Sequence, residues 1–175
     1  MGISITVTIN AAQVRQAFNR LTLLMSDTTP VMRAIGTGLI AGTHDRFQMG
    51  VSPEGAPWKK LTPQYAMTKR GAGILRESAM AGGLMGSIAM EAGRDQVAVG
   101  SNKIYAAVHQ FGATITPKSG QYLVFWMGGR LIKARSVTIP ERPYLGVSSD
   151  DQVMIGDVVT GFLSRALGQG GRPRR

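Results

Sequence analysis

The sequence has no cysteine among its 175 residues, and it has only two histidines. Without cysteine the chain has no thiol nucleophile, and disulfide scaffolds and zinc ribbons are excluded. His44 and His109 have no second histidine or carboxylate at metal-ligand spacing, and no His-Glu-x-x-His segment occurs. The sequence therefore predicts no metal site and no cofactor.

Long apolar runs are also missing. The longest candidate, residues 31–41, is interrupted by Arg33 and several glycines, so it is too short and too polar to span a membrane. No basic region followed by an apolar block opens the chain. Gly2 and Thr6 match an N-myristoylation pattern. However, the alternation of apolar and polar residues over 3–9 favours a half-buried strand. We expect a soluble protein with no membrane partner.

Catalytic motifs are equally scarce. There is no Gly-x-Ser-x-Gly segment and no phosphate-binding loop ending in Gly-Lys. Residues 36–41 have the glycine spacing of a dinucleotide fingerprint. That fingerprint requires a strand before the glycines, whereas here a helical pattern runs in from Val31 and continues. The small residues favour close helix packing instead, and the sequence predicts a protein that is not an enzyme.

Positive charge is abundant, with 20 Lys and Arg against 10 Asp and Glu and a net charge of +10. A charge of this size attracts polyanions such as nucleic acid or acidic protein surfaces. The basic residues are scattered along the chain and are not gathered on one helix face. This pattern favours solvated basic loops beside an acidic neighbour. A basic nucleic-acid-binding protein remains the alternative from another functional class.

Helical periodicity predicts three long elements. Asn10 is placed to cap a helix from Ala11, in which apolar residues at 14, 18, 21 and 25 form a stripe expected to pack against the core. Pro30 is placed in the first turn of a second helix that ends near Gly50. The two could equally form one kinked helix. A last helix is expected over residues 148–167, capped by a serine at 148 or 149.

Shorter elements complete the expected fold. Residues 87–91 and 96–100 read as strands around a turn, and residues 122–127 and 130–133 form the clearest hairpin, joined by Gly128-Gly129. Short helices are expected over 62–69, after a Thr-Pro cap, and over 104–111, which Gly112 ends. Residues 140–143 (PERP) break the sheet.

These elements predict an α+β fold. A mainly antiparallel sheet with a prominent β-hairpin would pack against a long N-terminal helix, or a kinked helix pair, and a C-terminal helix. We expect one domain over residues 1–167 and a flexible, basic Gly/Arg/Pro tail over residues 168–175.

Four segments, in this order, resemble a known family. They are Arg46-Phe47 with residues 52–58 (SPEGAPW), residues 75–78 (LRES) with Leu84 and Ser87-Ile88, residues 99–101 (VGS) with residues 105–112 (YAAVHQFG), and residues 139–146 (IPERPYLG). Together they are similar to the virion morphogenesis, or tail-completion, proteins of Mu-like and related tailed phages. Two departures occur, a short insertion at Met80-Ala81 before Gly83-Leu84, and Glu141 where a small residue is frequent.

The resemblance implies a structural virion protein of a bacteriophage that completes the tail and joins it to the head at the neck. It implies a homo-oligomeric ring, commonly a hexamer, with the head-closure protein, the tail terminator and the tail tube as partners. Non-specific contact with packaged DNA is a further option for the basic tail. It implies no catalysis and no cofactor, and a location in the virion tail or neck after assembly in the host cytoplasm. Another neck component, a tail terminator or a head-closure protein, is the nearer alternative.

Aromatic and basic side chains in the loops and hairpin have the character of interface anchors. The candidates are Trp58, Lys59, Lys60, Tyr105, His109, Phe111, Tyr122, Phe125, Trp126, Arg130, Arg142 and Tyr144. Two alternatives stay open, that Trp58 covers the core and that one face of the hairpin is buried. On the interface interpretation, replacing Trp58 or Arg142 should impair assembly more than folding.

Overall fold

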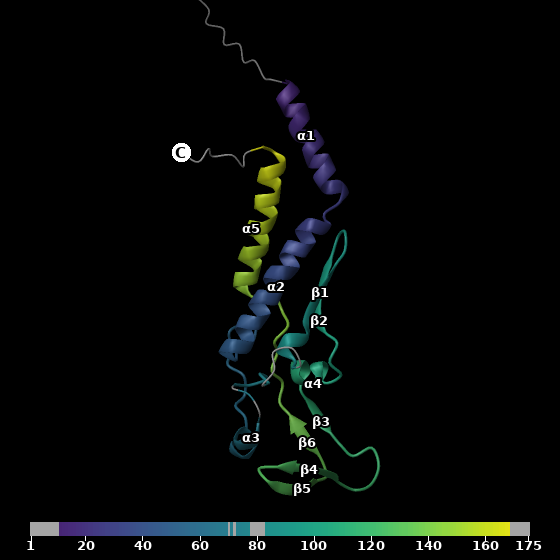
Figure 1. The fold of residues 1–175 in the computed structure, drawn as a ribbon, viewed down its shortest axis with the longest axis vertical. Helices are drawn as coiled ribbons and strands as arrows, with labels where there is room; N and C mark the ends of the chain where they lie inside the picture. The colour runs from purple at the N-terminus through teal and green to yellow at the C-terminus, as the bar shows by residue number, and fades with distance from the viewer. Residues whose placement is uncertain (1–10, 70, 72, 78–82, 169–175) are drawn as a thin grey trace, which may run out of the picture.

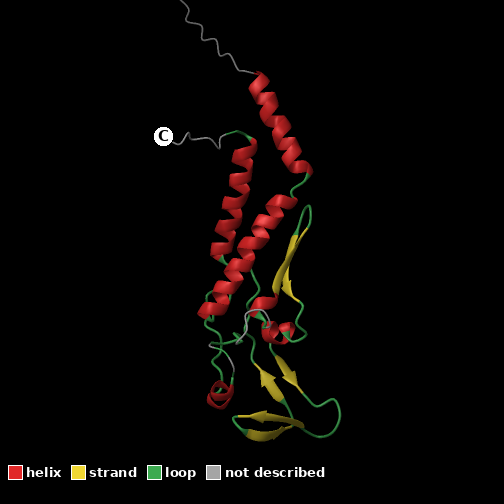
Figure 2. Ribbon diagram, in the orientation of Figure 1, coloured by secondary structure: helices red, strands yellow, loops and turns green. Residues whose placement is uncertain are grey.

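In a computed structural model of the chain, long helices run along an elongated body and small β-ribbons lie beside and beyond them (Figure 1; coloured by secondary structure in Figure 2). The structure describes residues 11–69, 71, 73–77 and 83–168. The helices are α1 (Ala11–Ser26), α2 (Thr29–Met49), α3 (Pro63–Thr68), α4 (Ala106–Phe111) and α5 (Ser149–Ala166), with a 3-10 turn at Met85–Ser87. The strands are β1 (Ile88–Ala92), β2 (Val97–Ser101), β3 (Ala113–Ile115), β4 (Leu123–Met127), β5 (Arg130–Ala134) and β6 (Val137–Ile139). The α+β class is confirmed. The expected strand over 3–9 and the tail from residue 169 lie outside the described residues.

Helix α2 has the boundaries that its proline and glycine predict. Pro30 lies in its first turn, and Gly50 ends it in the left-handed conformation with φ of 71°. The N–H of Gly50 donates to the carbonyl of Arg46 at 2.8 Å. A break after Ser26 separates α1 from α2, so the N-terminal region is a pair of helices and not one continuous helix.

Small residues on α2 allow α5 and the β1–β2 ribbon to approach it closely, as the sequence predicted. A Cβ added at Gly38 would lie 2.5 Å from the sulfur of Met154, and one at Gly42 would lie 2.5 Å from Oδ1 of Asp151. A Cβ at Gly36 would collide with Met90 of β1. Glycines therefore serve two sides of one helix, and α2 becomes the element on which α5 and β1–β2 both pack.

The expectation that the apolar stripe of α1 packs against the core is wrong. Helix α1 extends beyond the ribbons at one end of the molecule and has only limited contact with α5 (Figure 1). Val14 is 42% exposed, Phe18 64% and Met25 62%. Helical periodicity reports that a helix has an apolar face, but it does not say whether the same chain covers that face.

The expected sheet is instead three separate two-stranded antiparallel ribbons within the described residues. The predicted hairpins are confirmed as β1–β2 and β4–β5, and Gly128 and Gly129 have φ values of 62° and 75°. The β3–β6 pair was not predicted. Among the described elements, β1–β2 packs on α2, whereas β4–β5 lies at the end opposite α1 and touches α3 (Figure 1).

The core lies where α2, the 51–58 loop, α4 and the segment before α5 meet. Its buried apolar members are Phe47, Trp58, Leu75, Leu84, Ile88, Ala106 and Tyr144. The fold therefore has one compact centre with an extension at each end.

Candidate functional site

Three of the four motif segments converge on one group of buried and half-buried side chains, which we term the central cluster: Arg46, Phe47, Trp58, Gln110, Tyr144 and Asp151. The ring of Phe47 lies 5.7 Å from that of Trp58 in an edge-on arrangement, and 5.1 Å from that of Tyr144. The indole N–H of Trp58 donates to the carbonyl of Pro143 at 2.8 Å. Aromatic stacking and this hydrogen bond fasten the 51–58 loop to the segment before α5.

Arg46 and Asp151 form a buried ion pair, with Nη1 and Oδ2 2.8 Å apart and both side chains 5% exposed. The Nε of Arg46 donates to the carbonyl of Tyr144 at 3.0 Å. Its Nη2 donates to Thr43 Oγ1 at 3.0 Å and to the carbonyl of Gly146 at 3.1 Å. Every nitrogen of this guanidinium is thus hydrogen-bonded, as a buried charge requires.

Asp151 also belongs to the cap of α5. Ser148 Oγ accepts from the N–H of Asp151 at 3.1 Å, and the carboxylate of Asp151 accepts from the N–H of Ser148 at 2.9 Å. Burial raises the pKa of Asp151, but the hydrogen bonds from Ser148 and Arg46 together outweigh it and hold the pKa below its ordinary value. The carboxylate therefore stays ionised against α2.

Gln110 joins α4 to the segment before α5. Its Oε1 accepts from the N–H groups of Tyr144 and Leu145, each at 3.0 Å. Its Nε2 donates to the carbonyl of Leu145 at 2.9 Å, and the hydroxyl of Tyr144 donates to the carbonyl of Ala106 at 3.1 Å. Residues 144–145 belong to no described strand. The Gln110 side-chain amide therefore satisfies backbone groups that a neighbouring strand would otherwise pair with.

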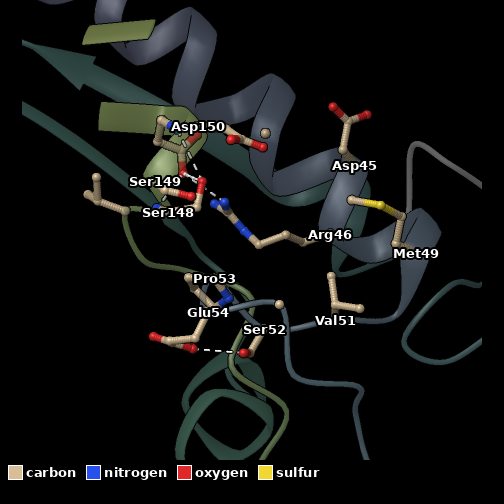
Figure 3. Close-up of a pocket in the computed structure, with 14 residues that line it drawn as sticks. Asp45, Arg46, Met49, Val51, Ser52, Pro53, Glu54, Ser148, Ser149 and Asp150 are labelled. Atoms are coloured by element: carbon tan, nitrogen blue, oxygen red, sulfur yellow. Dashed lines mark hydrogen bonds and ion pairs between the residues drawn. The ribbon is translucent and has the colours of Figure 1, made fainter. Parts of the chain in front are cut away.

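A pocket of about 450 Å³ opens between the end of α2, the 51–55 loop and the start of α5. Figure 3 shows Arg46 reaching across it from α2 toward the start of α5, and Ser52 Oγ donates to Glu54 at 2.7 Å. The guanidinium already has its partner. The exposed charges of the lining, Asp45, Glu54 and Asp150, are all negative, so we term this hollow the acidic pocket.

A second pocket, of about 530 Å³, lies between α3, β4 and the segment after β6, and its lining holds three cations and no carboxylate. We term it the basic pocket. Six of the twelve predicted interface residues line it: Lys59, Lys60, His109, Phe125, Trp126 and Arg142. The structure therefore brings half of the sequence candidates into a single site.

The remaining candidates are dispersed. Trp58 is 5% exposed and Tyr144 1%, so the interface interpretation of these two is corrected: their side chains are inside the core. Arg142 is also buried, at 5% exposed, so its replacement disturbs the fold as well as the pocket. The candidates that line neither pocket and lie outside the core are Tyr105, Phe111, Tyr122 and Arg130.

The two histidines, His44 and His109, are both partly buried in the fold. His44 Nε2 lies 3.1 Å from the carbonyl of Met85. Burial, and then the charge of Arg142, lower the pKa of His109, whose Nδ1 is buried without a hydrogen-bond partner in the described part of the chain. Within the described ranges, no group of three or more acidic or histidine side chains is placed to hold a metal ion. None of the described helices is long and apolar enough to cross a membrane.

Sequence reasoning missed the polar members of the central cluster, Arg46, Gln110 and Asp151, as a group. One signal was present: Ser148 and Asp151 have the spacing of a capping box, which marks the start of α5 and the position of the carboxylate. Nothing local indicates that Arg46 is its partner, because the two residues are 105 positions apart.

Apolar side chains are exposed on the two extensions, which we term the arms: α1 and the β4–β5 hairpin. Leu23 on α1 is 72% exposed and Trp126 on β4 is 73% exposed.

Comparison with known proteins gives concordant matches. A family model described as the phage virion morphogenesis family matches residues 9–164. The "Putative capsid assembly protein G" of Escherichia phage Mu is 25% identical over 172 residues, which cover 97% of this chain and all of that protein. The Mu-like prophage FluMu G protein 2 of Haemophilus influenzae is 29% identical over 146 residues, 83% of this chain and 86% of that protein. No solved structure matches.

Proposed function

The chain belongs to the phage virion morphogenesis family, and from this premise we propose that it completes the phage tail and joins it to the head as a ring-forming connector at the neck. Membership makes it a phage structural or assembly protein. The likeness to a protein named for capsid assembly, along the whole length of both chains, supports a role in building the virion.

The observation that carries the connector proposal is the separation between the core and the arms. The polar groups of the central cluster have hydrogen-bond partners inside the fold. By contrast, Phe18, Leu23 and Met25 on α1 are 64%, 72% and 62% exposed. Trp126 and Val124 on β4 are exposed at the opposite end, at 73% and 56%. Apolar surfaces of this kind mark protein contacts. An elongated subunit with such a surface at each end suits lateral and axial neighbours.

On this proposal the protein performs no reaction, and its work is surface complementarity. Formation of a ring would bury the arms, and the completed ring would present one face to the head-closure protein and the other to the tail terminator and tail tube. Net charge of +10 favours acidic surfaces on these neighbours.

The test is electron microscopy of lysates from a phage that carries an early stop codon in this gene. We expect filled heads to accumulate beside separate, unjoined tails, and joined virions to return when the gene is supplied on a plasmid. Normal joined virions without the protein would refute the proposal. Aberrant or empty heads would instead place the protein in capsid assembly, and tails of uncontrolled length would indicate a tail terminator.

A further inference from the structure

The basic pocket contains a buried cation that has no counter-charge within the described chain. Arg142 is 5% exposed, and its Nε donates to the carbonyl of Lys59 at 2.9 Å. Its two terminal nitrogens make no hydrogen bond to a described residue, although the side chain lines the pocket. Arg46, the other buried arginine described, uses all of its nitrogens. These two nitrogens are not among the buried unpartnered atoms of the described residues, so solvent reaches them. They are therefore placed to bind an anion that arrives from outside.

The remainder of the pocket defines what kind of anion fits. Lys59 and Lys60 are exposed at its edge and add positive charge. Phe125 of β4 and His109 of α4 also line it, and so do Trp126 and Tyr65. The pocket therefore combines a forked cation with apolar walls, which suits a carboxylate that is flanked by apolar side chains.

A protein carboxylate fits this site better than a nucleic acid does. Nucleic acid is bound through a series of exposed cations that follow its phosphates. Here the forked cation is part of the lining of a hollow of about 530 Å³ whose lining is largely apolar. An acidic side chain with apolar neighbours on a helix turn would fill such a hollow and satisfy the fork.

The chain itself carries a turn of this kind. Asp150, in the first turn of α5, is exposed, and Val147 and Val153 on either side are 53% and 65% exposed. Residues three apart on a helix lie on one face, so Val153 lies beside Asp150. Val147 precedes the helix and lines the same pocket as Asp150. The rest of α5 has no basic residue before Arg165. We term this group the acidic turn.

We propose that the basic pocket of one copy receives the acidic turn of a neighbouring copy, with Arg142 and Lys60 binding Asp150. The inference rests on the proposed ring and specifies its subunit contact. The acidic turn begins α5 beside α2, away from the β4–β5 end of the molecule (Figure 1). The contact is therefore head to tail, with a different surface of each copy, which is the arrangement that closes into rings.

The test is the molar mass of the purified full chain, measured by size-exclusion chromatography with light scattering and by native mass spectrometry. Lys60→Glu and Asp150→Lys should each weaken self-association at least tenfold while circular dichroism stays unchanged, since both side chains are exposed. Mixing the two variants should restore assembly in part, because the charge at position 60 then matches the charge at position 150 while Arg142 stays cationic. In an alternating ring, each reversed pocket meets a reversed turn and each native pocket meets a native turn. Lys118→Glu and Asp95→Lys, also exposed, are the matched controls and should assemble normally.

The outcomes separate this contact from the proposed function. If the wild type and both variants assemble equally, the contact is overturned and the ring stands. If the single variants fail and their mixture also fails, the pairing with Asp150 is overturned. A wild type that stays monomeric overturns the contact and the ring together. Retardation of duplex DNA by the wild type but not by Lys60→Glu, with no change in mass, overturns the carboxylate in favour of nucleic acid.

Discussion

The central cluster and the arms use apolar and aromatic side chains in opposite ways. In the cluster, Phe47 and Tyr144 are each 1% exposed and are surrounded by bonded polar groups. On the arms, Phe18 and Trp126 are 64% and 73% exposed. The cluster is made by segments distant in sequence, whereas each arm is a local element, one helix or one hairpin. The cluster stabilises the fold, and the arms are left to contact other molecules.

The difference changes how the motif segments should be interpreted. The segments that resemble the family supply the interior: Arg46 and Phe47 from the first, Gln110 from the third and Tyr144 from the fourth. In this chain, three of the four segments that carry the family resemblance supply core residues. The surfaces that would meet neighbours lie partly outside those segments, on α1 and on the β4–β5 hairpin.

The largest expected effect is in the cluster. Arg46→Met leaves Asp151 buried without its cation, and we expect a loss of about 3–5 kcal/mol in the free energy of unfolding, measured by urea denaturation. Arg33→Met, on the exposed face of the same helix, is the control and should change stability by less than about 0.5 kcal/mol. Equal effects of the two substitutions would show that the pair does not hold the fold.

Acid should remove the contribution of Asp151 without a mutation. Its pKa is lowered in the fold, so its stabilisation is present above the unfolded value of about 3.9 and is lost as pH falls through the lower folded value. Asp151→Asn should therefore be much less stable than the wild type at neutral pH, and the gap should narrow in acid. The difference in free energy of unfolding between the two proteins can be measured by chemical denaturation from pH 7 to pH 2.5. A difference that does not change with pH would contradict this assignment.

A smaller loss is expected at Gln110. Gln110→Ala leaves the N–H groups of Tyr144 and Leu145 without an acceptor, and we expect a loss of about 1–3 kcal/mol in the free energy of unfolding. Gln152→Ala removes an exposed glutamine of α5 and serves as the matched control. Thermal unfolding of both variants measures this loss. Equal stabilities of Gln110→Ala and Gln152→Ala would show that the Gln110 amide does not stabilise the segment before α5.

The smallest effect on stability is expected on the arms. Phe18→Gln should change the free energy of unfolding by less than about 0.5 kcal/mol, because the side chain is exposed and glutamine is a good helix former. The same variant should self-associate more weakly than Asn19→Gln, its neighbour on the exposed helix, in sedimentation velocity. A large loss of stability with unchanged association would erase the distinction between arm and cluster.

Much of the local structure could be predicted because its signals are local. Pro30 and Gly50 delimit α2, and Gly128-Gly129 fixes the β4–β5 turn. The β3–β6 pair could not be predicted, since its three-residue strands are more than 20 positions apart and no turn joins them. The burial of α1 was predicted wrongly, because an apolar stripe gives no information on what covers it.

The candidate site was predictable in composition but not in arrangement. Aromatic and basic residue types identified six side chains of the basic pocket. The same criterion also selected Trp58 and Tyr144, because ring chemistry is the same in a core and at an interface. Which of the two environments applies depends on contacts across the fold, such as the bond from Trp58 to Pro143, 85 positions away.

The distance along the chain between Arg46 and Asp151 also sets the order in which the protein can form during synthesis. The two residues are 105 positions apart, and ribosomes add about 5–20 residues per second. The residues between Arg46 and Asp151 therefore take about 5–20 s to synthesise. During this interval the Arg46 side chain has no Asp151 carboxylate with which to form its ion pair. Contacts of such long range also form slowly once available. The nascent chain must keep α2 and an unfinished core from aggregating until the first turn of α5 has been made.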